Sequence, residues 1–129
     1  MQIHQSAEDY LETILMLIQR MAKVRYIDVL HELGFTKARV SIALKKLREK
    51  GYIAVDGEGN LTLLEPGLEI AQRIYSRHQL LTHFFVQLGV DEQTAAEDAC
   101  KAEHILSEQT LEKIRESALR NDAAHPQAK

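Results

Sequence analysis

The chain has 129 residues, of which 45% are hydrophobic and 5% aromatic, and its formal net charge is −3. This length suits one domain, or a small domain with an appended helical part, and the aliphatic composition favours helices over a β-sandwich or barrel. The single Cys excludes an internal disulfide framework, and neither a membrane span nor a signal peptide is recognisable. We therefore expect a cytoplasmic protein with no membrane partner.

Three helices are predicted in the first half of the chain. Apolar residues recur at helical spacing between residues 6 and about 22, and again over residues 25–34. Thr36 can cap a third helix over residues 36–50, which stops at Gly51. A tight turn that contains glycine joins the second helix to the third, as in a helix-turn-helix.

A β-hairpin is predicted directly after the third helix. Residues 52–55 and 61–64 are β-prone, and the segment 56–60 between them, DGEGN, has the composition of a turn. A hairpin in this place is the wing of a winged helix-turn-helix. Residues 1–65 are therefore expected to form a DNA-binding domain.

The second half of the chain is predicted to be helical. Pro66 suits the first turn of a long helix, and Asp91 and Ser107 suit the N-caps of two further helices. The predicted helices span residues 66–88, 91–106 and 107–119. Residues 66–120 are thus expected to form one helical region, and the polar segment 121–129 a disordered tail.

The helical region has more apolar faces than a chain of this size needs for one core, which favours a homodimer. The predicted dimer surface contains Leu80, Leu81, Phe84, Phe85, Leu88, Leu106, Leu111 and Ile114. The alternative is that these side chains form the core of a monomer. The expected fold class is mainly α, with a winged helix-turn-helix followed by a helical dimerisation region.

The third predicted helix is a basic segment in an acidic chain. Residues 36–50 contain six Lys or Arg and one Glu, a net charge of +5, so the rest of the chain sums to −8. Val40, Leu44 and Leu47 fall on one side of this helix. Because Lys and Arg bind phosphates and guanine edges, this helix is predicted to bind DNA. The alternative interpretation is a basic face that is only exposed to solvent. The predicted DNA-contacting residues are Thr36, Lys37, Ala38, Arg39, Ser41, Ile42, Lys45, Lys46 and Arg48.

A second group of residues has the chemistry of metal ligands. Asp9 and Glu12 lie one turn apart in the first predicted helix. Cys100, Glu103 and His104 share a face of the penultimate helix. With a histidine of the long helix, the candidate set is Asp9, Glu12, His78, Cys100, Glu103 and His104. Carboxylate, imidazole and thiolate groups on facing helices can bind a divalent first-row metal.

Each candidate ligand also has an ordinary structural explanation. Asp9 could serve the start of its helix, because it lies three residues after Ser6. Glu12 could be a surface charge, and Cys100 a small buried hydrophobic residue. The two histidines could be ordinary hydrogen-bonded side chains. Spacing alone leaves both interpretations open, because it does not show that the helices converge.

Segments spread over nearly the whole chain are similar to one known family. They are SAEDYLETI at 6–14, VSIALKKL at 40–47, GYI at 51–53, IYSRHQLLTHFFVQLGVDE at 74–92 and DACKAEHILS at 98–107. The chain thereby resembles the diphtheria toxin repressor and manganese transport regulator family of metal-dependent bacterial transcription factors. In that family, metal bound between a winged helix-turn-helix and a helical dimerisation region promotes operator binding. The resemblance implies that the six candidate residues are the metal ligands.

The chain departs from the family pattern at its sensor. Asp9 matches the manganese branch of the family, whereas Cys100 matches the iron branch. Thr82 stands where both branches have Glu, and Ala96 stands where the iron branch has the His of an ancillary site. A second site of that kind is therefore not expected. We do not expect the C-terminal SH3-like domain of the longer iron-type members, and this expectation makes the architecture closer to the manganese type.

The expected cofactor is a divalent transition metal, Mn2+ or Fe2+. A thiolate is a soft ligand that favours Fe2+, Co2+, Ni2+ or Zn2+ over Mn2+, while two carboxylates favour Mn2+ or Fe2+. Co2+, Ni2+ or Zn2+ are expected to substitute in vitro. The ligand chemistry leaves the choice between Mn2+ and Fe2+ open.

The resemblance implies a metal-dependent, DNA-binding transcriptional regulator, which we expect to repress metal-uptake genes when metal is bound. The twofold symmetry of a homodimer implies a palindromic operator in double-stranded DNA. No small organic substrate is expected. The alternative is a winged-helix transcription factor that responds to a non-metal ligand or to a partner protein.

Motifs of metal-dependent enzymes are incomplete in this chain. A di-iron carboxylate bundle uses Glu-x-x-His on two helices, but Glu103 is followed directly by His104. His31 and Glu32 begin a zinc-protease motif whose second histidine would fall at position 35, which is Phe35. We therefore expect that the protein is not an enzyme.

Overall fold

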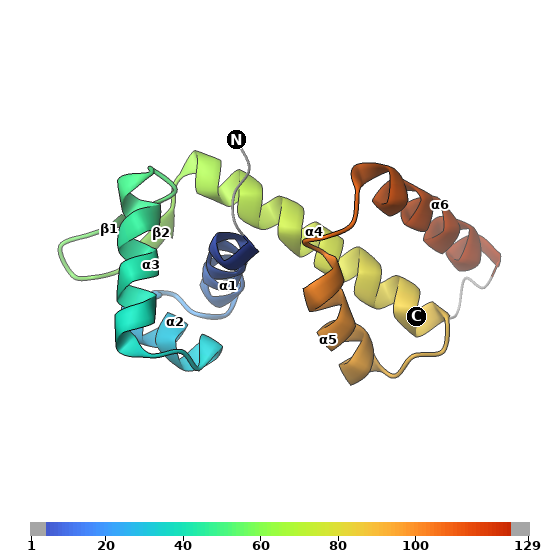
Figure 1. Ribbon diagram of the computed structural model, residues 1–129, viewed down its shortest axis with the longest axis horizontal. Coiled ribbons are helices and arrows are strands. Elements are labelled where there is room, and N and C mark those ends of the chain that lie inside the picture. The colour runs from blue at the N-terminus through green and yellow to red at the C-terminus, as the bar shows by residue number, and fades with distance from the viewer. Residues whose placement is uncertain (1–4, 125–129) are drawn as a thin grey trace. The chain divides into compact units, whose positions relative to one another are not determined.

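The computed structural model describes residues 5–124, with side chains from Ala7 onward, and it divides into two compact units. The first unit extends to Arg73 and the second begins at Ile74, within one continuous helix. In the part of the chain that is described, no helix is long and apolar enough to span a membrane. In chain order the elements are α1 (Gln5–Arg20), α2 (Tyr26–Leu33), α3 (Lys37–Glu49), β1 (Ile53–Val55), β2 (Leu61–Leu63), α4 (Glu65–Gln87), α5 (Glu92–Ala102) and α6 (Glu108–Ala124) (Figure 1).

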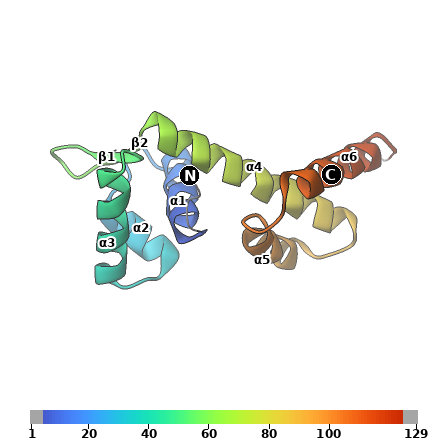
Figure 2. The same cartoon turned by 45° about the horizontal axis from the view of Figure 1, so that its top comes forward.

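The first unit packs three helices and a hairpin around an aliphatic core. Helix α1 contacts α2, α3 and β2, and α3 contacts β1. Figures 1 and 2 both show the hairpin extending beside α3. The buried core includes Leu11, Ile14, Leu15, Val24, Val29, Val40, Leu44, Ile53 and Leu61. The predicted winged helix-turn-helix is therefore confirmed.

Local hydrogen bonds and one glycine define the turn between α2 and α3. The backbone N–H of Arg25 donates to the Asp28 carboxylate at 2.9 Å, which fixes the start of α2. Gly34 ends that helix at a φ of 67°, in the left-handed region that glycine adopts without strain. The Thr36 hydroxyl then accepts a hydrogen bond from the Arg39 N–H at 3.2 Å. Thr36 is therefore the N-cap of α3, as predicted.

The hairpin that follows α3 has a turn organised by Asp56. Strands β1 and β2 pair antiparallel, with Ile53 opposite Leu63. The Asp56 carboxylate accepts hydrogen bonds from the Asn60 N–H and the Glu58 N–H, both at 2.9 Å. These bonds, those from Asn60 above all, lower the pKa of the Asp56 carboxyl group below its ordinary value. The turn is therefore built around an ionised carboxylate.

The second unit contains the C-terminal part of α4 together with α5 and α6. Leu81 of α4, Ala99 of α5 and Leu111 of α6 form its buried core. The prediction that Leu81 and Leu111 form a dimer surface is therefore wrong, because both side chains are buried in the core of the unit. Leu88 is 64% exposed, so it remains available for such a surface.

Helix α5 ends earlier than the sequence indicated. It stops at Ala102 rather than near Leu106, and the intervening residues form a turn. Glu103 is the C-cap, and its N–H donates to the Ala99 carbonyl at 2.9 Å. The guanidinium of Arg77 donates to the Glu103 carbonyl at 3.1 Å. In a longer helix, this carbonyl would instead accept a hydrogen bond from a backbone N–H of the next turn. A tertiary contact therefore accompanies the end of this helix.

Helix α6 ends later than the sequence indicated. It continues past the predicted end at Leu119 to Ala124, so residues 121–124 of the predicted disordered tail are helical. The Asp122 carboxylate accepts a hydrogen bond from the Gln87 side chain at 2.9 Å and lies 2.9 Å from His83 Nε2. These contacts with α4 stabilise the last turn. The rest of the predicted tail, 125–129, lies outside the described residues.

Candidate DNA-binding and metal-binding sites

The outer face of α3 has the composition of a DNA-binding surface. Val40, Leu44 and Leu47 are buried on its inner face. Every residue predicted to contact DNA is exposed, namely Thr36, Lys37, Ala38, Arg39, Ser41, Ile42, Lys45, Lys46 and Arg48. Ile42, an apolar residue, is 56% exposed in the middle of this basic face, where a thymine methyl group could cover it. The helix therefore offers cations for phosphates and one apolar contact for a base.

Two of the predicted metal ligands lie on α1 in the first unit. Asp9 is half-buried, and Glu12 is only 5% exposed. Glu12 is therefore not the surface charge that the alternative interpretation required. The neighbouring Glu8 pairs with Arg73 at 3.7 Å. The side chain of Ser6, the possible capping partner of Asp9, lies outside the described residues.

Three other predicted ligands lie together in the second unit. His78 Nδ1 of α4 is 3.4 Å from Glu103 Oε2, and His104 Nε2 is 3.5 Å from Glu103 Oε1. The side chains of Glu103 and His104 are 0% and 1% exposed. The chain thus turns after α5 so that one carboxylate lies between two imidazoles.

The Glu103 carboxylate is the feature of this cluster that points to a cation. Within residues 5–124, neither of its oxygens accepts a hydrogen bond. Arg77 bonds only the backbone carbonyl of Glu103 and pairs with Glu108, so its charge does not neutralise this carboxylate directly. A buried carboxylate is strongly destabilising unless a cation or hydrogen bonds compensate it. Carboxylate and imidazole groups are ligands of divalent transition metals, so the residues present fit such an ion.

Cys100 and Thr82 lie near this cluster in sequence. Cys100 is on α5, one turn before Glu103, and it is exposed. It is therefore not the buried hydrophobic residue of the alternative interpretation. Thr82 is on α4, one turn after His78, and its buried hydroxyl makes no hydrogen bond within the described part of the chain. The sequence analysis assigned Thr82 no role, although its spacing from His78 and its place at a position that is Glu in both branches of the family were available signals.

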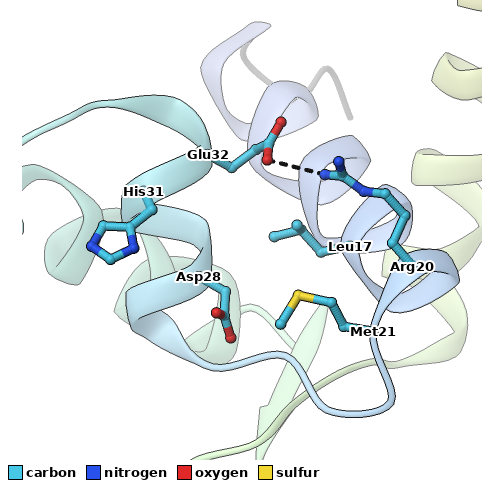
Figure 3. Close-up of a pocket in the computed structure, with 6 residues that line it drawn as sticks. All are labelled: Leu17, Arg20, Met21, Asp28, His31 and Glu32. Atoms are coloured by element: carbon cyan, nitrogen blue, oxygen red, sulfur yellow. Dashed lines mark hydrogen bonds and ion pairs between the residues drawn. The ribbon is translucent and has the colours of Figure 1, made fainter.

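A cavity of about 320 Å³ lies between α1 and α2 in the first unit (Figure 3). Its lining includes Asp28, His31 and Glu32, which recur at the spacing of one helix face. Figure 3 shows the Glu32 carboxylate directed at Arg20, and these groups form an ion pair at 3.0 Å. The Asp28 carboxylate already caps α2. Both acidic groups therefore already have structural partners.

The fold and these sites define a winged-helix DNA-binding protein whose helical second unit holds a cluster of residues with the chemistry of metal ligands. Residues 2–61 match the family described as "Iron dependent repressor, N-terminal DNA binding domain". Residues 64–126 match "Iron dependent repressor, metal binding and dimerisation domain". The chain belongs to the iron-dependent repressor family. It is therefore a metal-dependent, DNA-binding transcriptional regulator, and this family forms homodimers.

Individual relatives agree with this assignment. The chain is 37% identical over 113 residues to an uncharacterised helix-turn-helix-type transcriptional regulator of Methanocaldococcus jannaschii, covering 86% of this chain and 90% of that protein. It is 33% identical over 109 residues to the transcriptional regulator MntR of Bacillus subtilis, covering 84% and 77%. A solved manganese-dependent transcriptional repressor in complex with manganese is 27% identical, with a TM-score of 0.79 over 87% of this chain. The chain spans about half the length of that solved protein, 52%.

Proposed function

We propose that this protein is a repressor of metal-uptake genes that Mn2+ or Fe2+ activates, and that it acts in the cytoplasm and has no enzymatic activity. The observation that carries the proposal is the buried Glu103 carboxylate, which lies between two imidazoles and accepts no hydrogen bond within residues 5–124. Membership of a family with a metal-binding and dimerisation domain supports it. The solved relative described as a manganese-dependent transcriptional repressor supports Mn2+, and the thiol of Cys100 supports Fe2+.

The proposed ligands come from both units. Asp9 and Glu12 of α1 would supply carboxylates, and the second unit would supply the rest. The full proposed set is Asp9, Glu12, His78, Cys100, Glu103 and His104. The family resemblance supports this set, and so does the burial of Glu12 and Glu103. We also propose residues 1–65 as the DNA-binding domain and 66–120 as the metal-sensing and dimerisation region.

The switch would depend on repulsion between carboxylates. Without a cation, Asp9, Glu12 and Glu103 carry like charges, which disfavours their approach. A bound divalent ion supplies the positive charge that offsets them. The carboxylates of α1 and the ligands of the second unit would then hold α1 in one orientation and, in the homodimer, present the two α3 helices to one palindromic operator.

The proposed DNA contacts all lie at or near α3. The proposed set is Thr36, Lys37, Ala38, Arg39, Ser41, Ile42, Lys45, Lys46 and Arg48, and the exposure of every member supports it. Lys and Arg would bind phosphates, which makes the affinity fall with salt concentration. Ile42 and Lys45, in the middle of the helix, would meet base edges.

Metal addition is expected to raise DNA affinity at least about tenfold, which corresponds to about 1.4 kcal/mol of coupling between the two sites. The measurement is fluorescence anisotropy of a labelled promoter duplex at constant ionic strength, first with chelator and then with Mn2+ or, anaerobically, Fe2+. Equal affinity under all conditions would reject the metal switch. It would favour a winged-helix regulator that responds to a non-metal ligand or a partner protein.

Replacing Cys100 by Glu is expected to shift metal preference toward Mn2+, by about tenfold in the ratio of Fe2+ to Mn2+ affinities. The reason is that a hard carboxylate replaces a soft thiolate. Anaerobic titration with the two metals in competition measures the ratio. Cys100→Ser is the matched control, because it removes the thiolate without adding a carboxylate and should weaken Fe2+ binding without a gain for Mn2+. An unchanged ratio in both variants would exclude Cys100 from the site.

A further inference from the structure

Three side chains of the first unit connect α1 to the DNA-binding face of α3. The guanidinium carbon of Arg39 lies 3.8 Å from the centre of the Phe35 ring. The Phe35 ring in turn meets the edge of Tyr10, with ring centres 6.1 Å apart and planes inclined at 64°. Tyr10 belongs to α1, Phe35 to the turn after α2, and Arg39 to the first turns of α3. The contact series therefore joins α1 to the turn before α3 and to the first turn of α3, two segments that follow each other in sequence.

The contact with Phe35 restricts an arginine that would otherwise be mobile. Arg39 is exposed, and a long exposed side chain loses considerable rotamer entropy when it binds a ligand. A cation held over an aromatic face is already partly ordered. A guanidinium stacked in this way still presents its N–H groups at its edge, where phosphate or guanine acceptors bind. Phe35 can therefore orient Arg39 before DNA arrives.

Tyr10 places the other end of this contact series on α1. Its side chain is 3% exposed, and its hydroxyl makes no hydrogen bond within residues 5–124. Burial raises the pKa of the Tyr10 phenol, while the nearby charge of Arg39 opposes that shift. The Tyr10 ring thus packs against Phe35 even though its buried hydroxyl has no hydrogen-bond partner among these residues. Tyr10 also lies between Asp9 and Glu12 in sequence.

We propose that Phe35 is a positioning residue for DNA binding: it orients the Arg39 guanidinium and, through Tyr10, makes that orientation depend on α1. The second part rests on the proposed function, because α1 also carries the proposed ligands Asp9 and Glu12. When these carboxylates are held by a cation, α1 is held as well, and the Tyr10 edge supports the Phe35 ring. When α1 is released, Phe35 loses that support and Arg39 loses its fixed orientation.

A mutant cycle tests the positioning of Arg39. Phe35→Leu is expected to weaken metal-loaded DNA binding about two- to fivefold, whereas Phe35→Trp retains or tightens it, because Trp is the best cation–π partner. In an Arg39→Gln background, Phe35→Leu should have no further effect, since the two residues act as a unit. The readout is anisotropy of a duplex that the protein selects from a random pool, at fixed salt. Circular dichroism melting identifies any variant that is unfolded.

The same cycle distinguishes positioning from general packing. If Phe35 only fills space, Phe35→Leu will lower affinity equally with Arg39 or with its Gln replacement, and Phe35→Trp will not preserve binding. Either result would overturn the proposal. Phe35 is only half-buried, so the Leu and Trp variants are both expected to fold.

A fluorescence measurement tests the link to α1 without DNA. The chain contains no Trp, so Phe35→Trp introduces a single reporter directly beneath Arg39. Adding Zn2+, which is redox-inactive, to the chelator-treated variant should change the Trp emission. The change should persist with Tyr10→Phe, which keeps the ring, and disappear with Tyr10→Leu. Glu103→Gln in the same background is the control for non-specific metal effects.

The outcomes separate the two proposals. Unchanged Trp emission, together with metal-dependent DNA binding by the unaltered protein, would reject the link through Tyr10. Metal-independent DNA binding by the unaltered protein would reject the proposed metal switch. In that case the mutant cycle still decides whether Phe35 positions Arg39.

Discussion

Replacing Glu103 by Gln is expected to abolish the metal response of this protein. The carboxylate is fully buried between His78 and His104, and Gln provides no negative charge for a divalent ion. The gain in DNA affinity on metal addition, at least about tenfold in the unaltered protein, should fall to less than about twofold. Anisotropy with chelator and with Mn2+ measures this gain.

The same substitution is expected to preserve or raise the stability of the metal-free protein, although it abolishes the response to metal. Because Glu103 is a buried carboxylate that accepts no hydrogen bond within residues 5–124, Gln should leave the chelator-treated protein as stable as before or more stable. The unaltered protein should gain about 2.7 kcal/mol when the metal concentration is 100 times its dissociation constant, and Glu103→Gln should gain nothing. Thermal unfolding with and without metal measures both effects.

Glu97→Gln provides the matched control for charge loss, because Glu97 is exposed on the same helix. It should respond to metal as the unaltered protein does. If Glu103→Gln keeps the full response, Glu103 is not a ligand, and the metal assignment of the cluster is wrong.

Replacing Gly67 by Ala is expected to destabilise the first unit by about 3 kcal/mol or more. A Cβ atom at this position would lie 2.1 Å from the Tyr52 carbonyl oxygen and 2.9 Å from its carbonyl carbon. That carbonyl accepts a hydrogen bond from the Leu64 N–H at 3.0 Å, so it cannot move without disturbing the hairpin. The midpoint of thermal unfolding should fall by about 10 °C or more.

Gly57→Ala is the control for this substitution. A Cβ atom at Gly57 would meet no heavy atom within 4 Å, so the change in unfolding free energy should stay within about 0.5 kcal/mol. Urea unfolding of both variants in the same buffer gives the comparison. Equal stability of Gly67→Ala and the unaltered protein would mean that the start of α4 does not approach Tyr52 as closely as the structure shows.

The sequence by itself determined the winged helix-turn-helix, because the signals for that unit are local. The apolar spacing of α3, the Thr36 cap and the left-handed Gly34 all act within a few residues of the chain. The exposure of the basic face also followed from helical periodicity, since Val40 and Leu44 occupy the opposite side. The family resemblance supplied the candidate ligands as a set, which spacing alone left open.

Only the tertiary structure decided where the last two helices end and which apolar residues form the core of the second unit. Arg77 bonds the carbonyl at the end of α5, and Asp122 at the end of α6 bonds a side chain of α4. Leu81 and Leu111 meet only because their helices fold against each other. The edge contact of Tyr10 with Phe35 and the approach of His78 to Glu103 have the same origin. Such contacts depend on distances between segments, and residue periodicity contains no information about them.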